Sequence, residues 1–254
     1  MERAQLPEQQ DVTEDRVLGG RVVLRQPKSG YRAGLDAALL AAACDAGAGA
    51  RVIEAGCGVG GALLAAAARR PGARFTGVER DSAAGALAGQ NVGLNGLEDR
   101  VEIVGGDVAA GFRSLGLQPF DAALANPPFF DDPQALRGPN PERRGAYIAD
   151  GGLTDWTGFL LKSVVEGGTI TLIHRADRLA DILALLAPKA GSFRIRPVQP
   201  FADAPAKRVL VRAIKTGKAP LVLLPALVLH EREGGGHTAA AEALLRGSAG
   251  LDWD

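Results

Sequence analysis

Short apolar segments alternate with Ala- and Leu-rich segments along most of the chain. The apolar segments predict seven strands, at residues 51–55, 73–78, 101–104, 120–125, 169–173, 193–198 and 208–214. The segments between them predict helices, at residues 62–70, 83–94, 153–165 and 177–186. Because strands that alternate with helices form βαβ units, we expect an α/β fold of the Rossmann-like type with a mostly parallel sheet. The last two strands have no helix between them, which predicts an antiparallel hairpin at the end of the sheet.

Two further regions flank this pattern. Upstream, residues 20–27 predict a short strand that ends at Pro27, and residues 35–44 predict a helix with Asp36 near its start, where a carboxylate favours the helix dipole. Downstream, the apolar run 220–229 is followed by a Gly-rich stretch. We therefore expect three parts: an N-terminal segment (1–45), the main α/β domain (46–218), and a C-terminal extension packed on it (219–254).

Composition excludes several classes of protein. The 254 residues include 29 basic and 29 acidic side chains, so bulk charge gives no argument for nonspecific nucleic-acid binding. No apolar run approaches the roughly 20 residues of a membrane span, and the polar N-terminus does not resemble a signal peptide. The two cysteines predict no disulfide framework, and the three histidines lack metal-ligand spacing. We expect a cytoplasmic protein without a metal or a membrane partner; the sequence does not reveal its oligomeric state.

A glycine-rich turn joins the first strand of the main domain to its helix. Gly56, Gly58 and Gly61 fit the pattern G-x-G-x-x-G, in which glycines allow a tight turn and close approach of the backbone to a ligand. Glu79 ends the next strand, where a carboxylate accepts hydrogen bonds from a ribose diol. The pair predicts a cofactor that contains adenosine, without separating NAD from S-adenosylmethionine (SAM). The alternative is a merely structural glycine turn.

A third strand end also carries an acid. Asp107 lies just beyond residues 101–104, where side chains line the crevice of an open α/β sheet and an acid accepts from an adenine amino group. Taken alone, Asp107 is equally compatible with a surface turn. Its occurrence with Glu54 and Glu79 at successive strand ends favours a functional site.

The segment Asn126-Pro127-Pro128-Phe129 is the most specific signal in the chain. Two prolines fix φ and remove two N–H donors, and Asn126 is held extended because it precedes a proline. The segment thus presents the Asn126 side-chain oxygen and the Pro127 carbonyl as acceptors, and Phe129 as a flat apolar face. These groups suit a planar amine such as the exocyclic amine of adenine, with the aromatic ring stacked on the base. The alternative is a rigid loop with a buried aromatic residue.

These motifs resemble those of the class I SAM-dependent methyltransferases. Residues 54–60 are similar to their first motif, Glu79 and its neighbour Arg80 to the ribose-binding position, Asp107-Val108 to the adenine-binding position, and Asn126–Phe129 to the catalytic motif of amino-methyltransferases acting on adenine, cytosine or glutamine. Within that class the chain is most similar to bacterial tRNA (adenine-N6)-methyltransferases that act on the anticodon-loop adenine of a valine tRNA. The resemblance implies a class I sheet of about seven strands, SAM as cofactor and tRNA as substrate.

The resemblance also implies a set of site residues. Residues 26–36 correspond to a segment that packs over the cofactor, so the N-terminal part caps the cofactor site. The implied catalytic residues are Asn126, Pro127, Pro128 and Phe129. The implied cofactor-binding residues are Tyr31, Asp36, Glu54, Ala55, Gly56, Cys57, Gly58, Gly60, Glu79, Arg80, Asp107, Val108 and Asn126. Two features depart from the common pattern: Glu54 stands where Asp is also common, and Phe129 where Tyr is frequent.

Basic residues at two places are candidates for RNA contact. Arg137, Arg143 and Arg144 lie in the long loop after the catalytic motif, and a second cluster spans residues 207–218. Such residues bind phosphates, although charges on an edge strand are also a normal solvated surface.

Three other functions remain open from the sequence. The first is a methyltransferase acting on a small molecule or a protein. The second is an NAD(P)-dependent oxidoreductase, which leaves the Asn-Pro-Pro segment unexplained and lacks an evident hydride-transfer group. The third is a noncatalytic RNA-binding protein that retains the fold, against which the intact motif argues.

Overall fold

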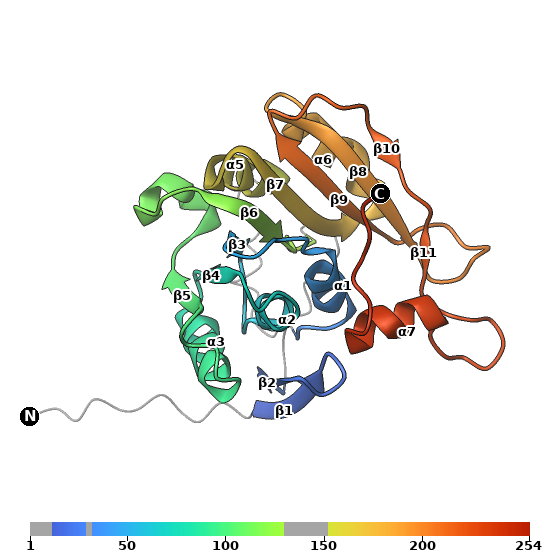
Figure 1. The fold of residues 1–254 in the computed structure, drawn as a ribbon, viewed down its shortest axis with the longest axis horizontal. Helices are drawn as coiled ribbons and strands as arrows, with labels where there is room; N and C mark the ends of the chain where they lie inside the picture. The colour runs from blue at the N-terminus through green and yellow to red at the C-terminus, as the bar shows by residue number, and fades with distance from the viewer. Residues whose placement is uncertain (1–11, 29–31, 130–151) are drawn as a thin grey trace, which may run out of the picture.

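A mostly parallel sheet forms the centre of the molecule (Figure 1). The computed structural model describes residues 12–28, 32–129 and 152–254. The parallel strands are β3 (Arg51–Ala55), β4 (Arg74–Glu79), β5 (Val101–Gly105), β6 (Phe120–Ala125) and β7 (Val164–Arg175). Strands β8 (Ala190–Gln199) and β9 (Arg208–Lys215) are antiparallel to each other, and β9 pairs antiparallel with β7. The order β8-β9-β7-β6-β3-β4-β5 confirms the expected class I sheet with its antiparallel hairpin.

Helices cover both faces of this sheet. On one face lie α1 (Leu35–Ala43), α2 (Gly61–Arg69) and α3 (Ser82–Leu94), and on the other lie α5 (Leu153–Ser163) and α6 (Leu179–Leu186). Successive strand residues face opposite cores: Val52 packs in the first and Ile53 in the second. Burial on both faces explains why these strands are almost continuously apolar in the sequence.

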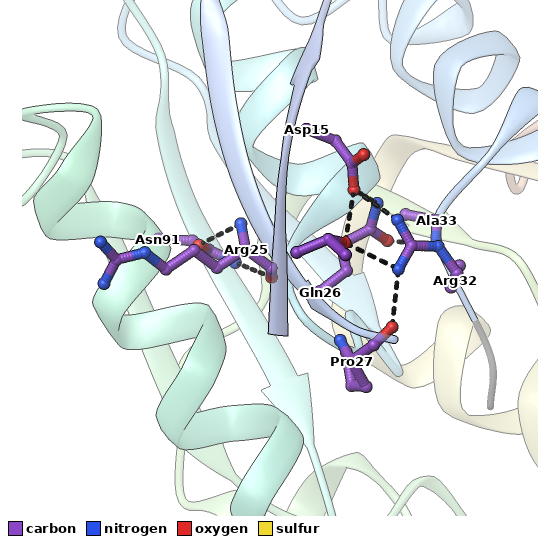
Figure 2. A network of polar contacts seen from close by, with 8 residues as sticks. Asp15, Arg25, Gln26, Pro27, Arg32, Ala33 and Asn91 are labelled. Carbon is purple, nitrogen blue, oxygen red and sulfur yellow. Dashed lines mark hydrogen bonds and ion pairs between the residues drawn. The ribbon is translucent and has the colours of Figure 1, made fainter. Parts of the chain in front are cut away.

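The N-terminal hairpin was not predicted in full. Residues 22–27 form the expected strand, β2 (Val22–Pro27), but β1 (Val12–Val17) pairs with it antiparallel. Two asparagines, Asn91 of α3 and Asn95 directly after its last residue, hold the free edge of β2. Asn91 accepts from the Arg25 N–H (2.8 Å) and donates to the Arg25 carbonyl (3.0 Å), as Figure 2 shows, and Asn95 does the same for Val23 (2.8 and 2.7 Å). The side-chain amides thus replace a neighbouring strand.

The C-terminal residues extend the same sheet. The short strands β10 (Val222–Leu223) and β11 (Leu227–Val228) both pair parallel with β8. Helix α7 (Ala239–Arg246) packs against α1, and the side chain of the preceding residue, Thr238, caps it by accepting from the Ala241 N–H. Near the C-terminus the buried Trp253 donates its indole N–H to the Ala43 carbonyl (2.9 Å). These contacts fix the end of α1.

Several element boundaries differ from the prediction. Strand β7 begins at Val164 rather than Thr169, because the chain passes directly from α5 into the sheet. The expected helix 177–186 begins with a 3-10 turn at Ala176–Arg178 before α6. Strands β10 and β11 and helix α7 were not predicted as elements. Among the described residues, no helix is both long and apolar enough to cross a membrane.

Asn91 provides a test of how the hairpin is attached. It is fully buried, and its amide also donates to the Val59 carbonyl (2.9 Å), next to the glycine-rich turn. We expect Asn91→Ala to lower the free energy of unfolding by about 2 to 3 kcal/mol, because buried backbone groups lose their partners. Denaturant unfolding measures this. The exposed neighbour Gln90 is the control, and an Asn91→Ala protein as stable as Gln90→Ala would contradict the interpretation.

Candidate active site

The hydrogen-bond register of the sheet brings the three predicted motifs to one edge. Ala55 of β3 pairs with Val78 of β4 on one side and with Ala125 of β6 on the other. The chain therefore leaves these strands at the same level. The residues that follow are Gly56, Glu79 and Asn126.

The glycine-rich turn depends on left-handed backbone conformations. Gly56, Gly58 and Gly60 have φ of +64°, +55° and +89°, which residues other than glycine rarely adopt. A side chain at position 56 would overlap the indole of Trp156 from α5, whereas the space beside Gly58 is open. Gly61, the last glycine of the pattern, begins α2 and packs against Ala33. The turn thus exposes its backbone at Gly58.

Glu79 is oriented toward this turn by two backbone donors. Its Oε2 accepts from the Gly58 N–H and its Oε1 from the Asp81 N–H, each at 2.8 Å. Each carboxylate oxygen keeps a further lone pair, so Glu79 can still accept hydrogen bonds from a pair of hydroxyl groups. The geometry suits the ribose-binding role that the sequence implies.

Asp107 begins a short 3-10 helix after β5. Its Oδ1 accepts from the Ala109 N–H (2.9 Å), and its Oδ2 lies 3.6 Å from an Arg80 nitrogen. The adjacent Val108 is buried in the second core. Asp107 therefore has a structural capping role, and it also lies beyond the carboxyl end of β5, where a ligand can reach it.

Glu54 is a buried acid with an unsatisfied oxygen. Its side chain is 3% exposed, and Oε2 has no hydrogen-bond partner among the described residues. Burial, followed by the charge of Glu79, raises the pKa of Glu54 well above its usual value. A buried acceptor without a donor is costly, and it suits a ligand that carries a cationic group.

Cys57 shows how the turn is joined to the sheet. Its backbone N–H donates to the Val78 carbonyl (3.0 Å), and its side chain lies beside Gly77, where any larger residue would collide with it. Burial raises the pKa of the Cys57 thiol well above its usual value, so it stays protonated. Cys57 therefore packs the turn and is not a nucleophile.

The Asn126–Phe129 segment leaves β6 beside β7. Pro127 is buried, whereas Asn126, Pro128 and Phe129 are half-buried. Ala125, the preceding residue, pairs with Leu172 of β7, so the segment runs along the end of that strand. Asn126 and Phe129 each keep part of their surface exposed at this edge of the sheet.

Phe129 lies in a cluster that the sequence did not reveal. His174 of β7 packs against it in a T-shaped arrangement, with ring centroids 5.0 Å apart, and the Arg208 guanidinium lies 4.6 Å above the ring. Arg208 in turn forms an ion pair with Asp36 at 3.0 Å. Asp36, which the resemblance implies to be a cofactor-side residue, is thus linked through Arg208 to the Asn126–Phe129 segment.

His174 is neutral in this environment. It is 2% exposed, and neither ring nitrogen has a hydrogen-bond partner among the described residues. Burial, with the charges of Arg175 and Arg208, lowers the pKa of His174 to about 4. It therefore packs against Phe129 as an uncharged aromatic ring near neutral pH.

The segment before α1 is held by a polar network, which Figure 2 shows. The buried Gln26 accepts from the Ala33 N–H (2.7 Å) and donates to Asp15 (2.9 Å). Arg32 donates to the Pro27 carbonyl (2.7 Å) and also pairs with Asp15. Because Ala33 packs on Gly61, the network fixes this segment against the first turn of α2.

The structure places most, but not all, of the predicted site residues. Tyr31, Arg137, Arg143 and Arg144 lie outside the described residues. Sequence reasoning missed Trp156 and the contact of His174 with Phe129. The position of His174 near the end of a predicted strand was an available signal, since the same rule identified Asp107. No sequence pattern marks Trp156.

The sequence of this chain is similar to those of known methyltransferases. The family model described as the methyltransferase small domain matches residues 32–137. A tRNA1(Val) (adenine(37)-N6)-methyltransferase from Porphyromonas gingivalis W83 is 30% identical over 193 residues, which cover 70% of this chain and 72% of the relative. A release factor glutamine methyltransferase from Gloeobacter violaceus is 41% identical over 86 residues, but the match spans only 29% of its length.

Solved structures share the fold. A predicted O-methyltransferase from Agrobacterium tumefaciens, protein Atu636, superimposes with a TM-score of 0.72 at 28% identity, covering 85% of this chain and 98% of that one. TrmN from Thermus thermophilus superimposes with a TM-score of 0.51 at 19% identity, covering 70% of this chain and 48% of that one, and shows the fold alone.

The chain belongs to the class I SAM-dependent methyltransferases that carry an Asn-Pro-Pro-Phe/Tyr motif. Its cofactor is SAM, and the residues present fit that group. Glu79 suits the ribose diol, the open backbone at Gly58 allows close approach, and the unsatisfied Glu54 oxygen suits the amino-acid ammonium. When bound, SAM supplies an electrophilic methyl group.

Two glycines with the same kind of backbone strain allow a test of the cofactor site. Gly58 and Gly49 both have positive φ and open space around them, but Gly49 lies away from the turn. We expect Gly58→Ala and Gly49→Ala each to lose about 1 kcal/mol of stability. Only Gly58→Ala should weaken SAM binding, by tenfold or more in calorimetry, since the added methyl group occupies ligand space. Equal SAM affinity in the two variants would contradict this site.

The lowered pKa of His174 predicts a pH dependence of stability. An unfolded histidine binds a proton below about pH 6.5, whereas His174 of the folded protein binds one only at a lower pH. The stabilising contribution is therefore complete above pH 6.5 and is lost as the pH falls toward 4. We expect His174→Phe, which keeps an aromatic ring against Phe129, to flatten the decline of unfolding free energy between pH 6.5 and 4. Parallel curves for both proteins would show that His174 does not contribute.

Proposed function

We propose that this methyltransferase transfers the methyl group of SAM to the N6 amine of an adenine in tRNA. The observation that carries the proposal is the position of Asn126–Phe129 at the end of β6, one strand away from the glycine-rich turn. Two hydrogen-bond acceptors, on Asn126 and Pro127, and the aromatic ring of Phe129 lie there, at the level of the sheet where the glycine-rich turn begins. These groups match the chemistry of a planar amine.

Asn126 and Pro127 would prepare the amine for reaction. The exocyclic nitrogen of adenine is a poor nucleophile because its lone pair is delocalised into the ring. Hydrogen bonds from its two N–H groups to the Asn126 side-chain oxygen and the Pro127 carbonyl favour a pyramidal nitrogen with an available lone pair. Alignment of this nitrogen with the methyl group then provides much of the rate. The product ammonium is acidic and loses its proton to water, so no strong general base is required.

Phe129 would hold the base. Arg208 covers one face of the ring and His174 packs against it, so the ring is held by contacts from two strands. A purine that stacks on the remaining accessible surface of Phe129 is positioned relative to Asn126. The neutral state of His174 leaves Arg208 as the cation beside this ring.

The N-terminal segment would close the cofactor site. We infer this from Arg32 and Ala33, which the hairpin network holds against Gly61. On this interpretation, residues 1–45 act as a cap on the methyltransferase domain, 46–218, and residues 219–254 are an extension packed against it. The contact of α7 with α1 supports the last point.

The names of several relatives support the nucleic-acid substrate. Relatives named tRNA1(Val) (adenine(37)-N6)-methyltransferase come from Porphyromonas gingivalis, Haemophilus influenzae and Pasteurella multocida. The match to the Porphyromonas gingivalis W83 protein reaches 72% of that protein's length.

Methylation of a protein glutamine is the second candidate. The similarity to the Gloeobacter violaceus enzyme named release factor glutamine methyltransferase favours it, although the match covers 34% of this chain. A glutamine side-chain amide is also a planar nitrogen with a delocalised lone pair, so Asn126 and Pro127 suit it equally well. The contacts that a substrate makes around Phe129 therefore distinguish an adenine from a glutamine.

The decisive assay follows labelled methyl groups from SAM. The acceptors are total tRNA from a strain lacking the gene, release factor protein from the same strain, and a pool of small metabolites. We expect label in tRNA alone, recovered after digestion as N6-methyladenosine. Label in the release factor or in metabolites alone would retain the methyltransferase and discard the RNA substrate.

Asn126→Ala provides the matched catalytic test. The variant loses one of the two acceptors for the amine, so we expect transfer to tRNA to fall by at least a hundredfold. Binding of SAM, measured separately by calorimetry, should stay within threefold of the original. A transfer rate that does not change would exclude Asn126 from the mechanism.

A further inference from the structure

A cavity lies beside Arg208, the residue that packs on the Phe129 ring. Its volume is about 320 Å³, and it lies between the start of α1, the end of β8 and the start of β9. Leu35, Val198 and Leu229 supply apolar walls. The charged lining consists of Arg32, Asp36, Lys207 and Arg208. No residue of the glycine-rich turn lines the cavity.

The charge of this cavity is positive. Three cations face one carboxylate, and that carboxylate, Asp36, is engaged with Arg208 at 3.0 Å. Arg32 pairs with Asp15 of the hairpin. Lys207 differs from both, because its exposed ammonium has no hydrogen-bond or ion-pair partner among the described residues. Lys207 is therefore available to an anionic ligand.

Arg208 connects this cavity with the catalytic motif. Arg208 lines the cavity, and its guanidinium lies 4.6 Å from the centre of the Phe129 ring. A single side chain, that of Arg208, therefore separates a group bound in the cavity from the position where the proposed base stacks. In a polynucleotide, the group found at that separation from a base is the phosphate of its own or the adjacent nucleotide.

We propose that this cavity binds a backbone phosphate of the RNA beside the adenine to be methylated, with Lys207 as its main electrostatic contact. This inference rests on the proposed function. The apolar walls suit the sugar attached to such a phosphate, and a small net positive charge suits a single phosphodiester. Arg208 keeps its contacts with Asp36 and Phe129 while the phosphate is bound. Arg208 therefore lies between the bound phosphate and the Phe129 ring, and the phosphate restrains that ring through it.

Removal of the Lys207 charge tests the proposal. Lys207 is exposed, so Lys207→Ala should fold normally, and the exposed Lys189, outside the cavity lining and outside the cluster 207–218, provides the matched control Lys189→Ala. Transfer to tRNA is measured over a series of salt concentrations, together with SAM binding. We expect Lys207→Ala to raise the KM for tRNA by about five- to tenfold and to reduce the slope of log kcat/KM against log salt by about 1. The kcat and the affinity for SAM should not change, and Lys207→Arg should restore the original KM.

The outcomes separate the two hypotheses. If the original enzyme methylates tRNA but Lys207→Ala and Lys189→Ala have the same KM and salt slope, the cavity does not bind phosphate and the proposed function stands. If the original enzyme does not methylate RNA, the proposed function fails and this inference fails with it. Transfer to adenosine monophosphate that depends on Lys207, without transfer to tRNA, would overturn the RNA phosphate in favour of a free nucleotide.

Discussion

Hydrogen bonding between parallel strands brings the glycine-rich turn, Glu79 and Asn126 to one edge of the sheet. The pairing of Ala55 with Val78 and Ala125 sets the level at which three strands end. The glycine-rich turn, Glu79 and Asn126 all begin from that level. A slip of one residue in the pairing of these strands would move each side chain from one core to the other. Packing in the two cores therefore also fixes the register of the strands at the site. Stability and function depend on the same backbone contacts.

The fold was largely predictable from the sequence because local patterns dominate it. Seven apolar segments separated by helical stretches allow few arrangements once parallel pairing and crossover handedness are imposed. The turn at residues 56–61, the acid at 79 and the segment at 126–129 were likewise visible as short motifs. What escaped was determined by contacts distant in sequence. The edge of β2 is completed by asparagine side chains some 70 residues away, and nothing in residues 12–17 alone predicts a strand.

The same limit applies to the surroundings of the catalytic segment. Trp156, His174 and Arg208 come from three different elements, and only the folded chain brings them to Gly56 and Phe129. Their residue types are ordinary for a helix or a strand. Glu54 presents the opposite case, since its position in the motif was evident, whereas its unsatisfied oxygen and raised pKa follow only from complete burial. An unsatisfied buried oxygen lowers the stability of the protein without its ligand. A ligand group that donates to this oxygen removes that cost and is therefore bound more strongly.

The asparagine pair on α3 has a consequence for the motion of the N-terminal hairpin. Asn91 and Asn95 lie one helical turn apart and hold alternate residues of β2, Arg25 and Val23, through both N–H and carbonyl. The amide protons of these two residues are thus protected from exchange with solvent by side chains rather than by a second strand. Their hydrogen-exchange rates measure detachment of the hairpin from α3 independently of global unfolding. Since Asn91 also donates to the Val59 carbonyl, one buried side chain contacts both the hairpin and the glycine-rich turn, and the exchange rate of the Arg25 amide reports on the surroundings of the residue that joins them.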